Sequence, residues 1–261
     1  MKDNERPIAV FDSGVGGISV LRELQALMPN EKIIYYGDSV NAPYGERSLS
    51  EVRSLTLSAV EFLIEQGAKA LVVACNTATS AAVRILRGMY PSLPIVGIEP
   101  AIKPAVIYGE EQLGKRDGSS TVLVMATPVT ISQEKFAHLT EEYCKRAIIT
   151  PLKCPGLAEL IERGTPNSEE IKNYLADILA PYKNYDSVVL GCTHYPFIAH
   201  HIRSILPSTV IFDGGYGTAK EAMRRITEAG LLSDAERGEV IFISSKKGEE
   251  EIFKKFFELK I

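Results

Sequence analysis

The sequence lacks the features that mark several large classes of protein. Its 261 residues include only four cysteines, and none of them belongs to a CxxC pair or a Cys/His cluster at metal-ligand spacing, so no metal site is expected. The start of the chain is polar, and the first apolar run stops at Asp12, too soon for a signal peptide or a membrane-spanning helix. We therefore expect a cytoplasmic protein that has no contact with a membrane and keeps its cysteines as free thiols.

An excess of positive charge is lacking as well. The formal net charge is −4, and the lysines and arginines are scattered along the chain rather than gathered in one block. This pattern argues against nucleic acid as a partner. With 45% apolar and 24% charged residues, the composition is that of an ordinary globular protein long enough for two small domains.

Runs rich in Val and Ile alternate with helical segments along most of the chain, which predicts an α/β fold with parallel sheets flanked by helices. The runs are nearly continuous in apolar residues, so we expect both faces of each strand to be covered. A final amphipathic helix is expected at residues 246–260. The expected strands are residues 8–11, 32–36, 70–74, 95–98, 122–125, 147–150, 187–191, 210–213 and 240–243. The expected helices include residues 16–27, 49–66, 77–89, 132–144, 168–179 and 195–206.

Parts of the chain repeat each other. The segment ALVVACNT, which contains Cys75, matches SVVLGCTH, which contains Cys192, because each is a strand followed by a small residue, a cysteine and two polar residues. The segment IAVFDS, which contains Asp12 and ends with Ser13, resembles VLVMAT, which ends with Thr127. Asp12 and Thr127 precede their cysteines by 63 and 65 residues. This ordered set of matches indicates an internal duplication.

The duplication predicts two similar α/β domains related by a pseudo-two-fold axis, with the second domain inserted into the first. We place the first domain at residues 1–99 and 212–261 and the second at residues 100–211. In open parallel sheets, ligands bind beyond the carboxyl ends of the strands. We therefore expect an active site in the cleft between the two domains, with one cysteine reaching it from each side.

Polar residues of the kind that bind substrates follow the expected strands. Their place is at the carboxyl ends, where the loops lead into helices. They are Asp12, Ser13, Asp38, Tyr44, Gly45, Cys75, Asn76, Thr77, Thr127, Thr130, Cys192, Thr193 and His194.

Cys75 and Cys192 suit the inversion of a stereocentre. The pKa of a free cysteine, about 8.5, falls at the N-terminus of a helix because the thiolate is favoured there, and both residues come directly before an expected helix. One thiolate can remove an α-proton while a thiol on the opposite face returns one. The exposed N–H groups of such helix ends can hold a substrate carboxylate. The polar residues that can help them are Ser13, Asn76, Thr77 and Thr193.

Asp12 and His194 are candidates to tune or relay protons for the neighbouring thiols, since histidine titrates near neutral pH. Asp12 has an alternative role, which is to cap the glycine-rich turn that leads into the next helix. That turn, FDSGVGG, has neither the GxGxxG spacing nor a Walker lysine, so it is only a weak indication of nucleotide binding.

The other cysteines and histidines fit structural roles. Cys144 falls in an expected helix with apolar neighbours, and Cys154 falls in a loop. His138, His200 and His201 lie on expected helices without partners at metal-ligand spacing, so surface or capping roles are expected for them.

Four motifs give the sequence a resemblance to the glutamate racemase family, whose enzymes supply D-glutamate for bacterial peptidoglycan. The likeness covers essentially the whole chain, and the two cysteine motifs together are far more specific than either alone. The resemblance implies a cofactor-independent amino-acid racemase, without pyridoxal phosphate or metal, whose small-molecule substrates are L- and D-glutamate. The motifs are FDSGVGG at 11–17, YYGD at 35–38 with PYG at 43–45, ACNTAT at 74–79 and GCTHYP at 191–196.

The resemblance also implies roles for individual residues. It implies that Cys75 takes the α-proton of D-glutamate and Cys192 that of L-glutamate. Asp38 and Glu162 are implied as further catalytic acids beside Asp12 and His194, and Glu159 remains a rival for Glu162. The implied binding residues, with two threonines added from the strand ends, are Asp12, Ser13, Tyr44, Gly45, Asn76, Thr77, Thr127, Thr130, Thr193 and His194.

Three other functions remain open at this point. A racemase for aspartate, or a related isomerase with the same paired thiols, would differ in the length of its substrate. A two-lobed binding protein would explain the duplication but not the two matched thiols. A redox protein would need its cysteines within disulfide distance. The sequence leaves the oligomeric state open, a homodimer included.

Overall fold

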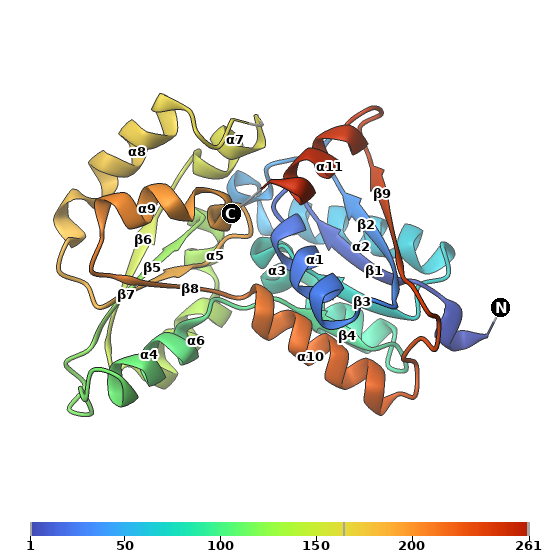
Figure 1. Ribbon diagram of the computed structural model, residues 1–261, viewed down its shortest axis with the longest axis horizontal. Coiled ribbons are helices and arrows are strands. Elements are labelled where there is room, and N and C mark those ends of the chain that lie inside the picture. The colour runs from blue at the N-terminus through green and yellow to red at the C-terminus, as the bar shows by residue number, and fades with distance from the viewer. Residues whose placement is uncertain (1, 164, 260–261) are drawn as a thin grey trace. The chain divides into compact units, whose positions relative to one another are not determined.

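The computed structural model describes residues 2–163 and 165–259, which form two compact α/β domains (Figure 1). Residues 2–99 and 215–259 make up the first domain, and residues 100–214 make up the second. The sequence placed the return to the first domain near residue 212. In the structure β8 (Val210–Asp213) pairs along its whole length with β7 (Ser187–Leu190), so the chain leaves the second domain only after this strand.

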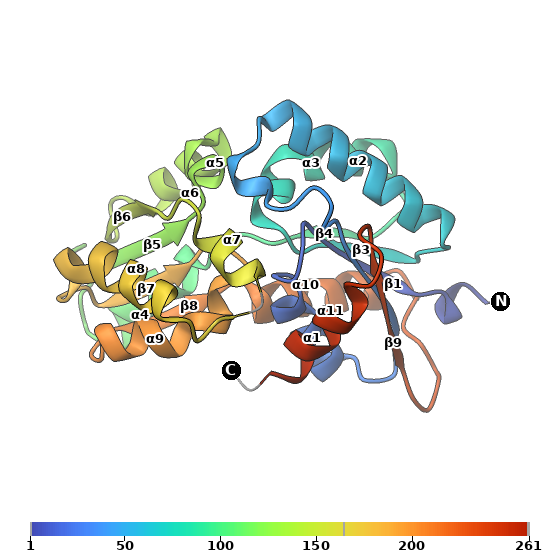
Figure 2. The same ribbon diagram turned by 90° about the horizontal axis from the view of Figure 1, so that it is seen from above.

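The first domain contains a five-stranded parallel sheet in the order β4-β3-β1-β2-β9. Its helices form two groups, since α2 packs with α3, and α1 packs with α10 and α11. Figure 2 shows these groups on opposite faces of the sheet. The strands are β1 (Ile8–Asp12), β2 (Lys32–Gly37), β3 (Ala70–Val73), β4 (Ile95–Gly97) and β9 (Glu239–Ser244). The helices are α1 (Ile18–Leu27), α2 (Leu49–Glu65), α3 (Asn76–Met89), α10 (Gly215–Glu228) and α11 (Glu250–Glu258).

The second domain contains a four-stranded parallel sheet in the order β6-β5-β7-β8. Helix α4 packs with α6, whereas α8 packs with α7 and α9, and Figure 1 draws these groups on opposite sides of the sheet. The strands not yet given are β5 (Thr121–Ala126) and β6 (Ile148–Lys153). The helices are α4 (Ile102–Glu111), α5 (Pro128–Ser132), α6 (Glu134–Tyr143), α7 (Leu157–Glu162), α8 (Glu169–Leu179) and α9 (Ala199–Ile205).

The two sheets share one topology. In each domain the first strand lies between the second and the third, and the fourth lies beyond the third. The first domain adds β9 beside its second strand. The prediction of two similar α/β domains with parallel sheets flanked by helices is therefore confirmed.

Burial follows the position of a strand in its sheet. The central strands β1, β3 and β7 are buried at every residue, as expected from their continuous apolar runs. The same expectation is wrong for the edge strands β6, β8 and β9, which are partly or largely exposed. Ile148 of β6, for example, is 55% exposed. An edge strand has only one neighbouring strand, and β4, the other edge of the first sheet, is mostly buried because both α3 and α10 pack on it.

Two expected helices differ from the observed elements. The segment expected as one helix at 195–206 is a 3₁₀ turn, Tyr195–Ile198, with Pro196 in its first turn, followed by α9. The C-terminal helix starts at Glu250 rather than at 246, after Gly248, whose φ of 88° is outside the helical region. It docks through Phe253 and Phe256, as its amphipathic pattern indicates, and residue 260 of the expected range lies outside the described residues.

Within the described part of the chain, none of the helices combines the length and the apolar character needed to cross a membrane.

Candidate active site

In the first domain, Cys75 lies where β3 ends and α3 begins. Neighbouring parallel strands end at the same edge of a sheet, so Cys75 after β3 and Ser13 after β1 meet there. The Cys75 thiol donates to Ser13 Oγ at 3.7 Å, and its sulfur accepts the N–H of Ala78 at 3.5 Å as the N-cap of α3. Cys75 is only 6% exposed. A thiolate here would face a hydroxyl and a helix N-terminus, both of which favour an anion.

Asp12 is fully buried at the end of β1. Its carboxylate accepts the N–H of Gly14 at 3.0 Å, so it does hold the glycine-rich turn, as the capping interpretation requires. The turn is tight, because a Cβ on Gly17 would come within 2.6 Å of the Asp12 Cβ. Asp12 also anchors the next strand end, since its carbonyl oxygen accepts the N–H of Asp38 at 3.0 Å.

Asp38 lies at the centre of a buried polar cluster. Tyr44 donates to its carboxylate at 2.6 Å, and the amide of Asn41 donates to both carboxylate oxygens at 3.1 Å. Burial, followed by the interaction with Asp38, raises the pKa of Tyr44, so its hydroxyl remains a donor. Gly45 follows in the same short 3₁₀ turn and is buried. Sequence reasoning missed Asn41, because a side chain–side chain hydrogen bond within a loop has no periodic signal in the sequence.

Asn76 and Thr77 occupy the first turn of α3, and both are buried. The Asn76 Oδ1 atom accepts no hydrogen bond from any described residue. A buried acceptor without a donor costs free energy unless a ligand satisfies it. This oxygen atom lies at the start of α3 and can accept a hydrogen bond from a bound ligand.

In the second domain, Cys192, His194 and Glu162 form a connected set. His194 Nδ1 lies 3.5 Å from Cys192 Sγ, and its Nε2 lies 3.1 Å from Glu162 Oε1. Burial alone would lower the pKa of His194, but the charge of Glu162 and the contact with Cys192 raise it well above its usual value. A protonated His194 places its positive charge between the Glu162 carboxylate and the Cys192 sulfur.

The surroundings of Cys192 differ from those expected. Cys192 precedes the 3₁₀ turn rather than an α-helix, and its carbonyl oxygen accepts the N–H of Tyr195 at 3.1 Å. The expectation that both cysteines precede a helix N-terminus is therefore wrong for this one. Pro196 lies in the first turn of this short element, and the imidazole of His194 is the side chain that contacts the Cys192 sulfur.

Three candidate threonines of the second domain, Thr127, Thr130 and Thr193, are buried in the segments that follow β5 and β7. Thr127 is the N-cap of α5 and accepts the N–H of Thr130 at 3.2 Å, while its own hydroxyl donates to Thr130 Oγ1 at 3.0 Å. These two residues thus have a capping role. Thr193 is 3% exposed between Cys192 and His194.

Contacts separate the two candidate glutamates on α7. The Glu162 side chain is 16% exposed and pairs with His194, whereas Glu159 is 50% exposed and pairs with Arg163 at 3.2 Å. Both lie on one six-residue helix.

The other two cysteines are unlike each other. Cys144 ends α6 as an exposed C-cap residue, so the expectation of apolar surroundings for it is wrong. Cys154 is buried, and burial together with the nearby Cys192 raises its pKa to about 12, which keeps it a neutral thiol. Sequence reasoning missed this neighbour of Cys192, because the two cysteines follow strands on either side of β5.

Of the three remaining histidines, His138 and His200 lie at the surface as expected, whereas His201 is buried. His201 is buried against the carbonyl oxygen of Pro166, and His200 contacts Asn167. His138 is exposed. The described residues contain no group of three or more His, Cys, Asp or Glu side chains placed to hold a metal ion.

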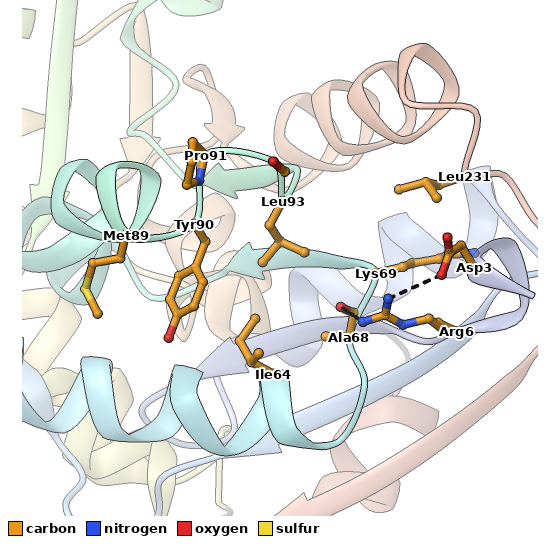
Figure 3. A pocket seen from close by; sticks show the side chains of 11 residues that line it. Asp3, Arg6, Ile64, Ala68, Lys69, Met89, Tyr90, Pro91, Leu93 and Leu231 are labelled. Atoms are coloured by element: carbon orange, nitrogen blue, oxygen red, sulfur yellow. Dashed lines mark hydrogen bonds and ion pairs between the residues drawn. The ribbon is translucent and has the colours of Figure 1, made fainter. Parts of the chain in front are cut away.

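A cavity of about 500 Å³ lies elsewhere in the first domain (Figure 3). Asp3 and Arg6 line it before β1, and Lys69 lines it before β3, so it lies at the amino ends of the strands. None of the expected site residues lines it. Its cations are already engaged, since Arg6 donates to two backbone carbonyls and Lys69 pairs with buried Glu31, and we assign no ligand to it.

Comparison with known proteins fits this arrangement. A family model described as Asp/Glu/Hydantoin racemase matches residues 18–222. A glutamate racemase of Clostridium perfringens is 48% identical over 260 residues, which cover 97% of each chain. A solved glutamate racemase from Bacillus anthracis superposes with a TM-score of 0.84 at 30% identity, over 99% of this chain and 96% of that one. The solved glutamate racemase from Francisella tularensis in complex with D-glutamate has a TM-score of 0.81 at 28% identity, over 99% of this chain and 95% of that one.

The chain therefore belongs to the Asp/Glu/Hydantoin racemase family. It is an amino-acid racemase, which is an isomerase, and it is similar over nearly its whole length to glutamate racemases.

Proposed function

We propose that this chain interconverts L- and D-glutamate without a cofactor, by proton transfer between the α-carbon and two cysteine thiols. The observation that carries the proposal is that each domain holds a buried thiol directly after its third strand, with polar partners of its own. The product D-glutamate would serve peptidoglycan synthesis in the cytoplasm. The similarity to glutamate racemases over nearly the whole chain supports this choice of substrate.

The proposed reaction needs one base and one acid. With L-glutamate, the thiolate of Cys192 removes the α-proton, and the electron pair of the C–H bond moves into the α-carboxylate. The thiol of Cys75 then donates a proton to the opposite face of the carbon, which gives D-glutamate and leaves Cys75 as the thiolate. The reverse reaction starts from that state, and proton exchange with solvent restores the first one.

The neighbours of the thiols suit this division of work. His194, held by Glu162, stabilises the thiolate of Cys192, while Ser13 and the start of α3 do so for Cys75. Asp12 supports the Cys75 side by fixing the glycine-rich turn, and Asp38 supports it through Tyr44.

Substrate binding is assigned to the polar residues of the strand ends. The N–H groups of α3 fit a carboxylate, and the unpaired Asn76 Oδ1 fits the substrate's ammonium group. Both groups are common to all α-amino acids, so the length of the side chain must decide between glutamate and aspartate. The residues that complete the proposed site are Ser13, Tyr44, Gly45, Thr77, Thr127, Thr130, Thr193 and His194.

A single incubation separates the candidate functions. Purified protein is given L-glutamate or L-aspartate in heavy water without added cofactor, and circular dichroism and α-deuterium are followed together. We expect loss of optical activity with deuterium incorporation for glutamate, and nearly none for aspartate. Faster reaction of aspartate would assign the other substrate, and binding without any deuterium uptake would indicate a binding protein.

A further inference from the structure

Two tyrosine hydroxyls hold the segment that leads into α7. Tyr195, the residue after His194, has a fully buried ring, and its hydroxyl donates to the carbonyl oxygen of Cys154 at 3.5 Å. Tyr174 of α8 donates to the next carbonyl, that of Pro155, at 2.9 Å. Neither tyrosine has a part in the proposed proton transfer.

Helix α7 needs such support. It has only six residues, too few for a stable helix on its own. Its N-cap is Gly156, in the left-handed region with a φ of 72°, and glycine has no side chain to cap the first turn. Three buried residues attach the helix to the core, namely Leu157, Ala158 and Ile161. The hydroxyl contacts at the two preceding carbonyls therefore contribute to fixing where the helix starts.

The far end of the same helix reaches the reacting group. Glu162, its last residue, pairs with His194, and His194 contacts Cys192. Tyr195 is covalently next to His194 and contacts the segment at the start of α7. The contacts thus form a closed ring that runs from the 3₁₀ turn to α7 and back to the imidazole.

We propose that Tyr195 is a positioning residue for Cys192, whose hydroxyl fixes the start of α7 and thereby keeps Glu162 against His194. The proposal rests on the function proposed above and deepens it. Burial raises the pKa of Tyr195 well above its usual value, so the hydroxyl is always available as a donor. The ring itself fills the core, which the substitution Tyr195→Phe leaves in place.

The test is the variant Tyr195→Phe. If Glu162 loosens, the titration midpoint of His194 falls, by about one pH unit for a loss of about 1.4 kcal/mol of interaction. The value of kcat/KM then falls about tenfold for the same loss, equally for both substrates because enantiomers are equally stable. Removal of the proton by Cys192 becomes more limiting, so the primary deuterium effect rises with α-deuterated L-glutamate and falls with D-glutamate. NMR of the four histidines and steady-state kinetics measure these changes.

Tyr185→Phe is the matched control. Its hydroxyl bonds Thr150 Oγ1 at 2.7 Å in the same domain and does not contact α7, so a general loss of stability would affect both variants but only Tyr195→Phe would shift His194. Tyr174→Phe removes an exposed hydroxyl and provides the same test, with a smaller shift in the same direction, if Tyr195→Phe does not fold. If the wild type is active and both Tyr195→Phe and Tyr174→Phe leave the His194 midpoint and the isotope effects unchanged, the proposal is overturned. A wild type that racemises no glutamate would instead overturn the proposed function.

Discussion

Cys75 and Cys192 are the same side chain in two different settings. Cys75 contacts a serine hydroxyl and the N-terminus of α3, whereas Cys192 contacts an imidazole that is itself paired with a carboxylate. The sequence repeat made the two motifs look equivalent. Their chemistry differs because a helix N-terminus acts at every pH, while the help from His194 depends on its proton.

Replacing either thiol gives a directional test of the proposed reaction. Cys75→Ser and Cys192→Ser should each lower racemisation by at least about 100-fold, the usual size of a lost general acid or base. The remaining cysteine can still remove and return a proton on its own face. Each variant should therefore exchange the α-proton of only one enantiomer in heavy water, Cys75→Ser that of L-glutamate and Cys192→Ser that of D-glutamate, as ¹H NMR would show.

The exposed Cys144 provides a control, since Cys144→Ser should leave both exchange rates unchanged. If both active-site variants preferred the same enantiomer, or if either kept wild-type racemisation, the two-thiol mechanism would be refuted.

Helix α7 carries two glutamates, and the structure shows which of them contacts His194. Glu159 and Glu162 share the helix, but only Glu162 contacts His194. In Glu162→Gln the charge that raises the pKa of His194 is gone, while burial, which lowers it, remains. His194 should then lose its proton at lower pH, so the alkaline limb of the kcat profile should move to lower pH.

The matched variant Glu159→Gln removes an exposed partner of Arg163 and should leave the profile in place. The two pH profiles, measured on one buffer series, show which glutamate raises the pKa of His194. A shift in the Glu159 variant alone would assign that effect to Glu159.

The elements also show what the sequence could predict. The strands were predictable because buried parallel strands have continuous apolar runs. The places of Cys75 and Cys192 just beyond the ends of such strands were predictable for the same reason. The 3₁₀ turn at Pro196 was not predictable, because proline is compatible with the first turn of a 3₁₀-helix and of an α-helix alike. The contact of Tyr195 with Cys154 was not predictable either, as it depends on which strands flank β5. Such contacts come from tertiary packing, which periodicity does not record.

At the scale of the whole molecule, one buried ion pair joins distant parts of the first domain. Lys69 pairs with Glu31, and both side chains are 2% exposed or less. Lys69 also donates to the carbonyl oxygen of Asn4 at 2.7 Å, and the other Glu31 oxygen accepts the N–H of Ser233 at 2.8 Å. The pair thus ties the first residues of the chain to the segment between α10 and β9.

Lys69→Met should leave Glu31 buried without a countercharge, which costs about 3–5 kcal/mol. We expect the free energy of unfolding, measured by urea titration, to fall by that amount. The kcat/KM of the folded enzyme at low temperature should stay near the wild-type value, because the pair lies at the amino ends of the strands. The double variant Lys69→Met with Glu31→Leu should recover part of the stability. Full stability in the single variant would show that water reaches this site.

The order of the strands along the chain has a consequence for how the protein forms during synthesis. Residues 100–214 are continuous, so the second domain can complete its sheet as soon as they have left the ribosome. The first domain is begun earlier but needs α10, β9 and α11, which are made last. Until then β2 lacks its outer neighbour and α1 lacks the helices that pack on it. The half of the protein that is translated first is therefore the half that finishes folding last.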